Sequence, residues 1–473
     1  MSTTAVEELL KPVLASAPGK VILFGEHAVV HGKTAVAAAV SDLRILVEVT
    51  PLVEPTLELH LPDLVGPDGE AVRLVRNSRD VGFTLGSTLK VESDEGATPP
   101  SEEVTEALHE LLSGTREGDR PALLPLLFLS TAILSNLFAD QTSPVRGLRV
   151  RAVSCCLPVS AGLGSSAALC VATAAALLEL RRRLAGGGRG GGGGGEGGDA
   201  RDAAAAAPAG KRERVWQPEG LETLNAWAYA AETLIHGNPS GLDNTVSCYG
   251  GVLRYVREPR STETVATFPQ LSMLLTDTRV AGRSTRRLVA HVATLLGRCP
   301  DVTARVLEAI DAIAKQFLAC GDEMTAEEVG ALMVMNHHLL GALGVGHASL
   351  DAVCAAAARR GCWSKLTGAG GGGCALTLLR ADLVSAARAD LIEELQARGF
   401  RCYASDLGGQ GVLLHADAHC APRAGGMTGL AARGGGGEGG RGGARGRRRA
   451  LAACAVYGVF AVACVVRVLR RQL

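Results

Sequence analysis

The sequence predicts an α+β protein, with two blocks of mixed helices and strands and a cleft between them. Strand-like and helix-like apolar patterns are mixed along the first block. Near Ser261 the pattern changes to one strand followed by long helical stretches. The 473 residues leave room for about two to three domains with cores of their own.

The first block opens with a strand pattern, a glycine-bearing loop and a second apolar element. Residues 15–40 contain a strand, the loop and a second apolar element, and residues 43–50 continue with β-type residues. Leucines recur at helical spacing from Glu103 to Ala139. Residues 148–159 alternate between apolar and polar types, as a half-buried strand does.

A run of serine and glycine follows that strand and leads into a helix rich in alanine and leucine, at residues 157–180. Ser165 or Ser166 can cap this helix, whose first N–H groups lack internal partners and carry partial positive charge. Gly162 and Gly164 bring no side chains, so phosphate oxygens can approach those groups. The loop is not a Walker A motif, because the GxxxxGK[ST] pattern is absent. A tight turn before a core helix explains the same residues equally well.

A glycine-rich insert, residues 185–213, interrupts the first block. Eleven of the 13 residues from Gly186 to Gly198 are glycine, which is typical of a flexible surface loop that forms no core. The regular pattern resumes with a helix that ends at Gly237.

The second block begins with a strand at residues 271–280 and continues with helical stretches to Leu343. A glycine loop then enters a strand within residues 365–379, and residues 411–416 form a last strand.

The tail, residues 424–473, is a Gly/Arg low-complexity segment that separates the charges of the chain. It holds nine arginines and one glutamate, a net charge of +8, so the residues before it carry −8 in a chain of net zero. That balance argues against nucleic acid as a partner of the globular part. The apolar segment 450–466 lies between arginines and, as a helix, would be about 25 Å long, at the lower edge of what spans a membrane. A membrane anchor and a helix without function both remain open.

Cysteines and the N-terminus indicate the compartment. The thirteen cysteines show neither CxxC pairs nor the Cys/His spacing of zinc fingers, as is typical of reduced thiols. The first residues, MSTTAVEELLKPVL, contain no apolar stretch of a secretory signal. We expect a cytoplasmic protein, with a peroxisomal or tail-anchored location as the alternative.

Four short stretches offer the groups that phosphoryl transfer requires. These groups are N–H donors for phosphates, oxygen ligands for Mg²⁺, a cation, and a carboxylate that receives a hydroxyl proton. The two glycine-containing loops supply the donors, and the candidate side chains are Lys20, Glu26, His27, Glu232 and Asp243. Taken singly, each has a plainer explanation, such as a solvated lysine, an exposed helix carboxylate, an N-cap aspartate or a structural histidine.

Five blocks in a fixed order resemble those of the GHMP superfamily of small-molecule kinases, and within it the animal mevalonate kinase family. The blocks are SAPGKVILFGEHAVVHGK, AGLGSSAA, IHGNPSGLDN, GVGHASLD and SKLTGAGGGGCALTLL. The resemblance covers roughly residues 10–415. It implies a ribosomal-protein-S5-like N-terminal domain at 10–258 and a ferredoxin-like C-terminal domain at 259–423, with the active site in the cleft between them.

The resemblance also implies an activity. It is the ATP-dependent phosphorylation of the C5 hydroxyl of mevalonate to 5-phosphomevalonate, an early step of isoprenoid and sterol biosynthesis. Asp243 would be the general base, and Lys20 would polarise the hydroxyl. The family further implies a homodimer and feedback inhibition by prenyl diphosphates that compete at the ATP site.

The remaining site residues are carried over from the same blocks. Ser166 and Glu232 would hold Mg²⁺, while His27, Thr285 and Ala369 would face mevalonate. The residues implied at ATP are Lys20, Asp63, Ser160, Ala161, Gly162, Leu163, Gly164, Ser165 and Ser166. One departure is Cys155, which stands where the family usually offers a serine hydroxyl to the nucleotide.

Other readings follow from the same residues. Galactokinases carry an aspartate after the GEH block, whereas Ala28, Val29 and Val30 follow it here and suit a smaller, partly apolar substrate. Phosphomevalonate and homoserine kinases share the Ser/Gly loop but not the combination of the first and third blocks. A non-catalytic, membrane-tethered member of the fold would be expected to lose Lys20, Glu232 or Asp243, and all three are present.

Overall fold

The computed structural model describes residues 3–85, 97–135, 137, 144–159, 161–186, 213–216, 218–237, 239–259, 261–282 and 284–416. These residues fall within one compact unit, 1–424. Ser160, residues 187–212 of the glycine-rich insert, and the tail with its apolar segment lie outside the described residues. Among the helices that are described, none is long and apolar enough to cross a membrane.

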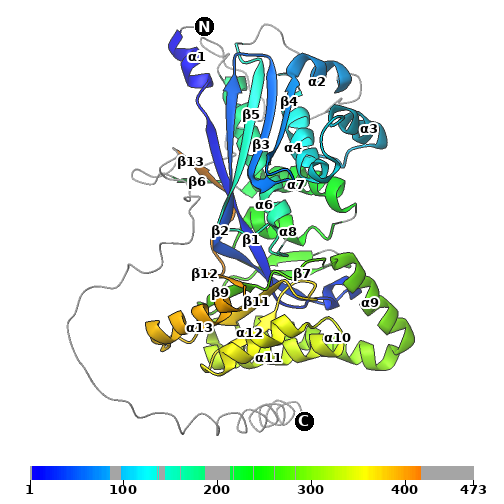
Figure 1. Ribbon diagram of the computed structural model, residues 1–473, viewed down its shortest axis with the longest axis vertical. Coiled ribbons are helices and arrows are strands. Elements are labelled where there is room, and N and C mark those ends of the chain that lie inside the picture. The colour runs from blue at the N-terminus through cyan, green and yellow to red at the C-terminus, as the bar shows by residue number, and fades with distance from the viewer. Residues whose placement is uncertain are drawn as a thin grey trace, which may run out of the picture. The chain divides into compact units, whose positions relative to one another are not determined.

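Among the described residues, nine strands form the larger of two sheets (Figure 1). They are β1 (Val13–Phe24), β2 (Ala35–Leu52), β3 (Thr56–Val65), β4 (Ala71–Asn77), β5 (Gly147–Cys155), β6 (Glu213–Val215), β7 (Val252–Val256), β8 (Ser261–Thr264) and β13 (Leu413–His415). The main order is β4-β3-β5-β2-β1-β13-β6, and β7 pairs with both β2 and β8. Only β3 and β5 run parallel to each other; the other paired strands are antiparallel.

The two central strands, β1 and β2, are buried along most of their length. A strand buried on both faces reads as a nearly continuous apolar run rather than an alternating one. Residues 15–40 show such a run. The structure confirms the strand predicted there as β1, and the second apolar element is the start of β2. The alternating pattern of residues 148–159 is likewise confirmed, as β5.

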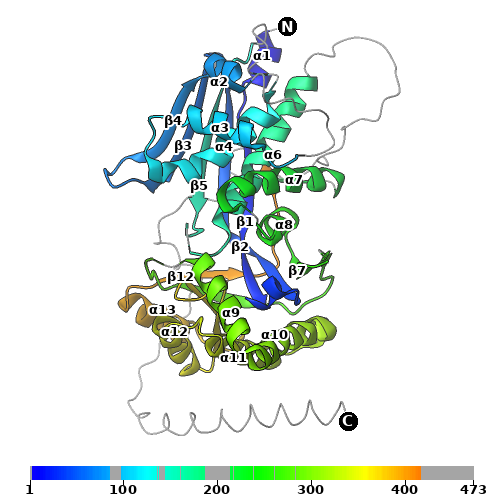
Figure 2. The same ribbon diagram turned by 90° about the vertical axis from the view of Figure 1, so that its right-hand side faces the viewer.

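Helices α6, α7 and α8 lie beside β1 and β2 (Figure 2). The helices of this half are α1 (Thr3–Leu9), α2 (Ser78–Leu85), α3 (Glu102–Leu111), α4 (Arg120–Ile133), α6 (Ser165–Gly186), α7 (Pro218–His236) and α8 (Leu242–Tyr249). Helix α6 packs on β1 and β2, and α4 and α7 pack on α6. The predicted end of α7 is confirmed, because Gly237 follows it with a φ of 69°.

In the described part of the leucine-rich region from Glu103 to Ala139, α3 and α4 are separate helices rather than one continuous helix. Gly114, with a φ of 77°, lies between them, and a proline stands in the first turn of α4. Glycine at a positive φ ends helices, and proline suits the first turn of a new one. The leucine pattern persists across the interruption because α3 and α4 both contribute leucines to the core.

The second half is built around a four-stranded sheet in the order β10-β11-β9-β12. Its elements are β9 (Ser272–Asp277), α9 (Thr285–Arg298), α10 (Pro300–Cys320), α11 (Ala326–Ala342), α12 (Ala348–Ala358), β10 (Trp363–Leu366), β11 (Cys374–Leu378), α13 (Ser385–Ala397) and β12 (Arg401–Asp406). Along the chain this is a β-α-β-β-α-β arrangement with several helices in the first crossover, as in ferredoxin-like folds. The predicted α+β class is confirmed, and so is the ferredoxin-like fold expected for this half.

The chain then returns to the first sheet. Strand β13 pairs with β1, with Leu14 opposite His415. The buried guanidinium of Arg44 holds the segment before β13 by donating to the carbonyl of Gly411 at 2.6 Å. The predicted domain boundary at residue 258 stays a prediction, although a strand from beyond it completes the first sheet.

Candidate active site

Lys20 lies on β1 and is 5% exposed. Its backbone N–H donates to the carbonyl of Leu163 at 2.8 Å, which ties the strand to the Ser/Gly loop. A side chain at Gly19 could not be accommodated, because its Cβ would lie 2.8 Å from the same carbonyl oxygen. The loop therefore passes directly over the strand that carries Lys20.

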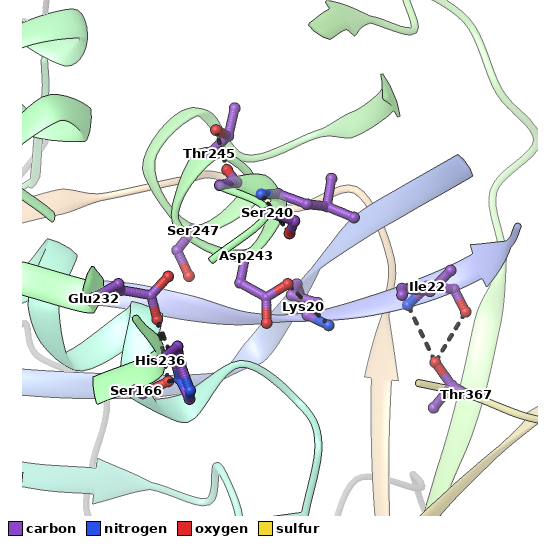
Figure 3. A network of polar contacts seen from close by, with 12 residues as sticks. Lys20, Ile22, Ser166, Glu232, His236, Ser240, Asp243, Thr245, Ser247 and Thr367 are labelled. Carbon is purple, nitrogen blue, oxygen red and sulfur yellow. Dashed lines mark hydrogen bonds and ion pairs between the residues drawn. The ribbon is translucent and has the colours of Figure 1, made fainter. Parts of the chain in front are cut away.

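Asp243 faces Lys20 from the first turn of α8 (Figure 3). The Nζ of Lys20 lies 3.1 Å from Oδ1 of Asp243, and the aspartate side chain is 35% exposed. The N-cap of α8 is Gly241 rather than Asp243. The explanation of Asp243 as an N-cap residue is therefore wrong, and its carboxylate is directed at the lysine.

Glu232 lies on α7, next to this ion pair. The hydroxyl of Ser166, in the first turn of α6, donates to Oε1 of Glu232 at 3.2 Å. Burial and, to a smaller extent, the nearby charge of Asp243 together raise the pKa of Glu232 to about 8, against the opposing effects of Ser166 and Lys20. A buried carboxyl with such a pKa lies where a cation would stabilise its charged form.

These residues fit a magnesium ion better than a transition metal. In the part of the chain that the structure describes, no three His, Cys, Asp or Glu side chains gather into a metal site. Mg²⁺ does not require such a cluster, since one or two protein oxygens suffice when phosphates and water complete its shell. The oxygens of Ser166 and Glu232, beside the further carboxylate of Asp243, match that requirement.

The Ser/Gly loop closes over the pair. Gly164 has a φ of 73°, and an added Cβ there would lie 3.0 Å from Cγ of Lys20 and 3.7 Å from Oδ2 of Asp243. Only glycine fits easily at a positive φ against these two side chains. Helix α6 begins at Ser165, so its first N–H groups, which lack partners within the helix, lie beside Lys20 and Asp243.

A second glycine loop, residues 367–373, meets the first. The hydroxyl of Thr367 donates to the carbonyl of Ile22 at 2.9 Å and accepts from the N–H of Ile22 at 3.1 Å, which fixes the loop to β1. An added Cβ at Gly368 would lie 3.7 Å from the carbonyl oxygen of Gly162. Both loops thus border the same end of the site.

His27 contacts this second loop. Its Nε2 lies 2.9 Å from the carbonyl oxygen of Ala369, and its backbone φ is 60°, which is unusual for a residue other than glycine. Burial lowers the pKa of the imidazole, so the neutral form is favoured and its N–H can donate to Ala369. The structure therefore brings together two of the three residues expected at the substrate.

The third, Thr285, is an exposed residue at the start of α9. In the described part of the chain no hydrogen bond joins it to His27 or Ala369. One turn later, Leu288 comes within 3.0 Å of the Cβ position of Gly371, so this helix does pack against the second loop.

Asp63 and Cys155 lie before the Ser/Gly loop rather than in it. The carboxylate of Asp63 accepts from the N–H of Ser154 at 2.6 Å. Burial raises the pKa of the Cys155 thiol to about 11, so it is protonated at neutral pH. Cys155 therefore presents a buried, protonated thiol at the position where the resemblance implies a serine hydroxyl.

Sequence reasoning missed a buried ion pair beside His27. The ammonium of Lys365, which is fully buried, contacts Oε1 of Glu26, and the amide of Asn336 donates to Oε2 at 2.9 Å. Burial raises the pKa of Glu26 and lowers that of Lys365, while their attraction opposes both shifts. No local pattern signals this pair, because 339 positions separate the two residues.

His236 was missed as well. Its Nε2 lies 3.3 Å from the hydroxyl oxygen of Ser166 and 4.0 Å from Oε1 of Glu232. A usable signal was present in the sequence, since residues four apart on a helix share a face. Glu232 therefore predicts that residue 236 also faces the site.

Known proteins with related sequences cover both halves of the chain. Residues 129–186 match the GHMP kinases N terminal domain, and residues 296–398 match the GHMP kinases C terminal domain. The mevalonate kinase of Mus musculus is 37% identical over 420 residues, which cover 87% of this chain and 97% of the relative. The mevalonate kinase of Homo sapiens is 38% identical over 418 residues, with 86% and 96% covered.

A solved structure shares the fold. The mevalonate kinase of Methanococcus jannaschii superimposes with a TM-score of 0.59 at 21% identity, over 84% of this chain and 98% of that one. The likeness inferred from five short blocks therefore extends to most of the sequence and to the arrangement of both halves.

Proposed function

The chain belongs to the mevalonate kinase family of the GHMP kinases, and from that premise we propose that it transfers the γ-phosphoryl group of ATP to the C5 hydroxyl of mevalonate. The observation that carries the proposal is the ion pair of Lys20 and Asp243 beneath the Ser/Gly loop. It sets a base and a cation beside the N-terminus of α6, where phosphates bind favourably.

The reaction needs few groups beyond these. The hydroxyl oxygen attacks the γ-phosphorus, the bond from that phosphorus to the bridging oxygen breaks, and ADP leaves. Asp243 receives the hydroxyl proton, and its partial exposure leaves the carboxylate accessible to substrate. Lys20 neutralises negative charge at the transferring group and keeps Asp243 oriented.

The phosphates would lie against the first N–H groups of α6 and the backbone of residues 161–166. Ser166 and Glu232 would hold Mg²⁺, which supplies positive charge to the β- and γ-phosphates. Support comes from the buried carboxyl of Glu232, whose pKa is raised by burial and by the charge of Asp243, since a bound cation would stabilise its charged form.

The substrate side supports mevalonate over a sugar. Ala28 and Val29, which follow His27, are buried apolar residues at the position where a galactokinase would present a carboxylate. His27 and Ala369 border this side, and we propose that they contact mevalonate together with Thr285.

Turnover with defined substrates tests the proposal. Purified full-length chain is assayed for ADP release with Mg²⁺, ATP and either mevalonate, galactose, homoserine or phosphomevalonate. We expect turnover with mevalonate and less than about a hundredth of it with the others, since burying a polar group of the wrong substrate without a hydrogen-bond partner costs free energy. Comparable turnover of any of the other three would replace the assigned substrate.

The finer assignments from the resemblance are proposals too. We propose a cytoplasmic homodimer inhibited by prenyl diphosphates at the ATP site. Analytical sedimentation tests the homodimer, and inhibition kinetics at varied ATP concentration test the binding of prenyl diphosphates at the ATP site. Carbonate extraction of cells expressing the full chain, or a version stopped after Pro422, tests whether the segment 450–466 anchors it.

A further inference from the structure

The hydroxyl of Ser166 has two polar neighbours but only one proton. Its oxygen lies 3.2 Å from Oε1 of Glu232 and 3.3 Å from Nε2 of His236. A serine hydroxyl donates to one acceptor at a time and keeps two lone pairs for other contacts. Which neighbour takes the proton decides which way the lone pairs point.

The position of His236 is set by the helix. It is the last residue of α7, four positions after Glu232, so both side chains project from one face. The helix stops there because Gly237 adopts a φ of 69° and its N–H donates to the carbonyl of Thr233 at 2.8 Å. Figure 3 shows Glu232, His236 and Ser166 grouped on the side of Asp243 away from Thr367.

Glu232 and His236 differ in what they can offer. The side chain of Glu232 is 3% exposed, and that of His236 is 50% exposed. In the structure, the hydroxyl donates its proton to Oε1 of the buried Glu232. A carboxylate that binds a cation directs its lone pairs to that cation, and the hydroxyl proton then needs another acceptor.

We propose that His236 is a positioning residue for the metal: its Nε2 accepts the Ser166 proton when a divalent cation lies between Ser166 and Glu232. The proposal rests on the proposed role of Ser166 and Glu232 as metal ligands. It requires the neutral imidazole with its proton on Nδ1. A hydroxyl held in this way keeps a lone pair directed at the cation, as partners of metal ligands commonly do.

Direct metal binding tests the proposal without relying on turnover. Mn²⁺ replaces Mg²⁺, and free Mn²⁺ is measured by electron paramagnetic resonance in the presence of full-length protein and ADP. Loss of a partner of a metal ligand typically weakens metal binding about 10–100-fold. We expect that loss for His236→Leu and much less of it for His236→Gln, whose amide oxygen can accept the proton.

The matched control is His109→Leu. His109 also lies in the last turn of a helix, α3, and is exposed. This variant should bind Mn²⁺ as the unaltered chain does. Equal Mn²⁺ affinity of His236→Leu and the unaltered chain would overturn the proposal, and so would equal losses for the Leu and Gln variants.

A double variant sharpens the result. If His236 acts through Ser166, adding His236→Leu to Ser166→Ala should weaken Mn²⁺ binding no further, because one contact cannot be lost twice. Additive losses would contradict the proposal. The outcome is independent of substrate identity: if the unaltered chain fails to phosphorylate mevalonate, the proposed function fails, whereas the Mn²⁺ series still decides the role of His236.

Discussion

Lys20 and Lys365 each meet a carboxylate near strand β1, yet their surroundings differ. Lys365 and Glu26 are fully buried, and Asn336 occupies the second oxygen of that carboxylate. Lys20 is paired with a partly exposed Asp243, and a second carboxyl group, Glu232, stands nearby.

The two clusters differ in charge balance. In the cluster of Glu26, Lys365 and Asn336, one cation meets one carboxylate and the polar contacts are internal to the protein. In the cluster of Lys20, Asp243 and Glu232, one cation faces two acids, and one of these is strongly buried. We therefore expect the first arrangement to hold the fold together and the second to leave charge that ligands complete. Removal of a group should therefore affect stability in the first and chemistry in the second.

The largest effect is expected for Asp243→Asn. The amide cannot take a proton, and a positioned general base contributes about 10²–10⁴-fold. We expect kcat for mevalonate to fall by that factor, with ATP affinity and melting temperature nearly unchanged. Steady-state kinetics, nucleotide titration and thermal unfolding measure the three quantities. If the variant keeps more than about a tenth of kcat, Asp243 is not the base.

Glu26→Gln should show the opposite profile. It leaves the Lys365 ammonium buried without its counter-charge, and breaking a buried pair costs about 3–5 kcal/mol of unfolding free energy. The double variant Glu26→Gln/Lys365→Met should regain part of this loss, since no buried charge remains. Urea unfolding measures both. A single variant as stable as the unaltered chain would show that the pair does not hold the fold.

Glu232 should make the stability of the metal-free protein depend on pH. Its pKa is raised from 4.5 to about 8 in the folded state, so the folded protein binds this proton more tightly than the unfolded chain. The resulting stabilisation is fully present below pH 4.5 and is lost as the pH rises through about 8. At about 1.4 kcal/mol for each unit, it amounts to a few kcal/mol.

Unfolding in urea with a chelator, at intervals from pH 4 to 9, measures this slope. Glu232→Gln should flatten it. Glu106→Gln, an exposed change on α3, should leave it unchanged. A Glu232→Gln variant with the original slope would assign the titration to another group.

The smallest effect is expected for Thr367→Val. The change removes both hydrogen bonds to Ile22 while keeping the side chain's shape, and each is worth about 1 kcal/mol. We expect a loss of about 1–3 kcal/mol in unfolding free energy, because the backbone groups of Ile22 are left without these partners. Thr294→Val, at an exposed site on α9, should change it by less than about 0.5 kcal/mol.

Sequence reasoning reached much of this molecule where the signal is local. The long apolar runs of β1 and β2 and the alanine-rich helix α6 each follow from residues adjacent in sequence. The same holds for the glycine that ends α7. The resemblance supplied Lys20 and Asp243, whose side chains meet although they are far apart along the chain.

Other features depend on contacts that no local pattern encodes. The pairing of Glu26 with Lys365 appears only when the two halves pack together. The contact of His236 with Ser166 requires knowing how α7 lies against α6. The interruption between α3 and α4 was missed because the helical spacing of the leucines continues across the glycines that separate the two helices. No local pattern in the sequence indicates that β13 joins the first sheet, because its partner strand β1 lies at the other end of the chain.

The return of β13 has a consequence for the order in which the protein can be completed during synthesis. Ser16 on β1 contacts His415 on β13 across 399 positions of sequence. At about 5–20 residues per second, a ribosome needs on the order of 20–80 s to make that stretch. Throughout this time the edge of β1 that will receive β13 is an open strand edge in the nascent chain, and open edges invite pairing with other chains. Growing chains of this protein should therefore depend on chaperones until the segment that contains Gly411 and β13 has left the ribosome.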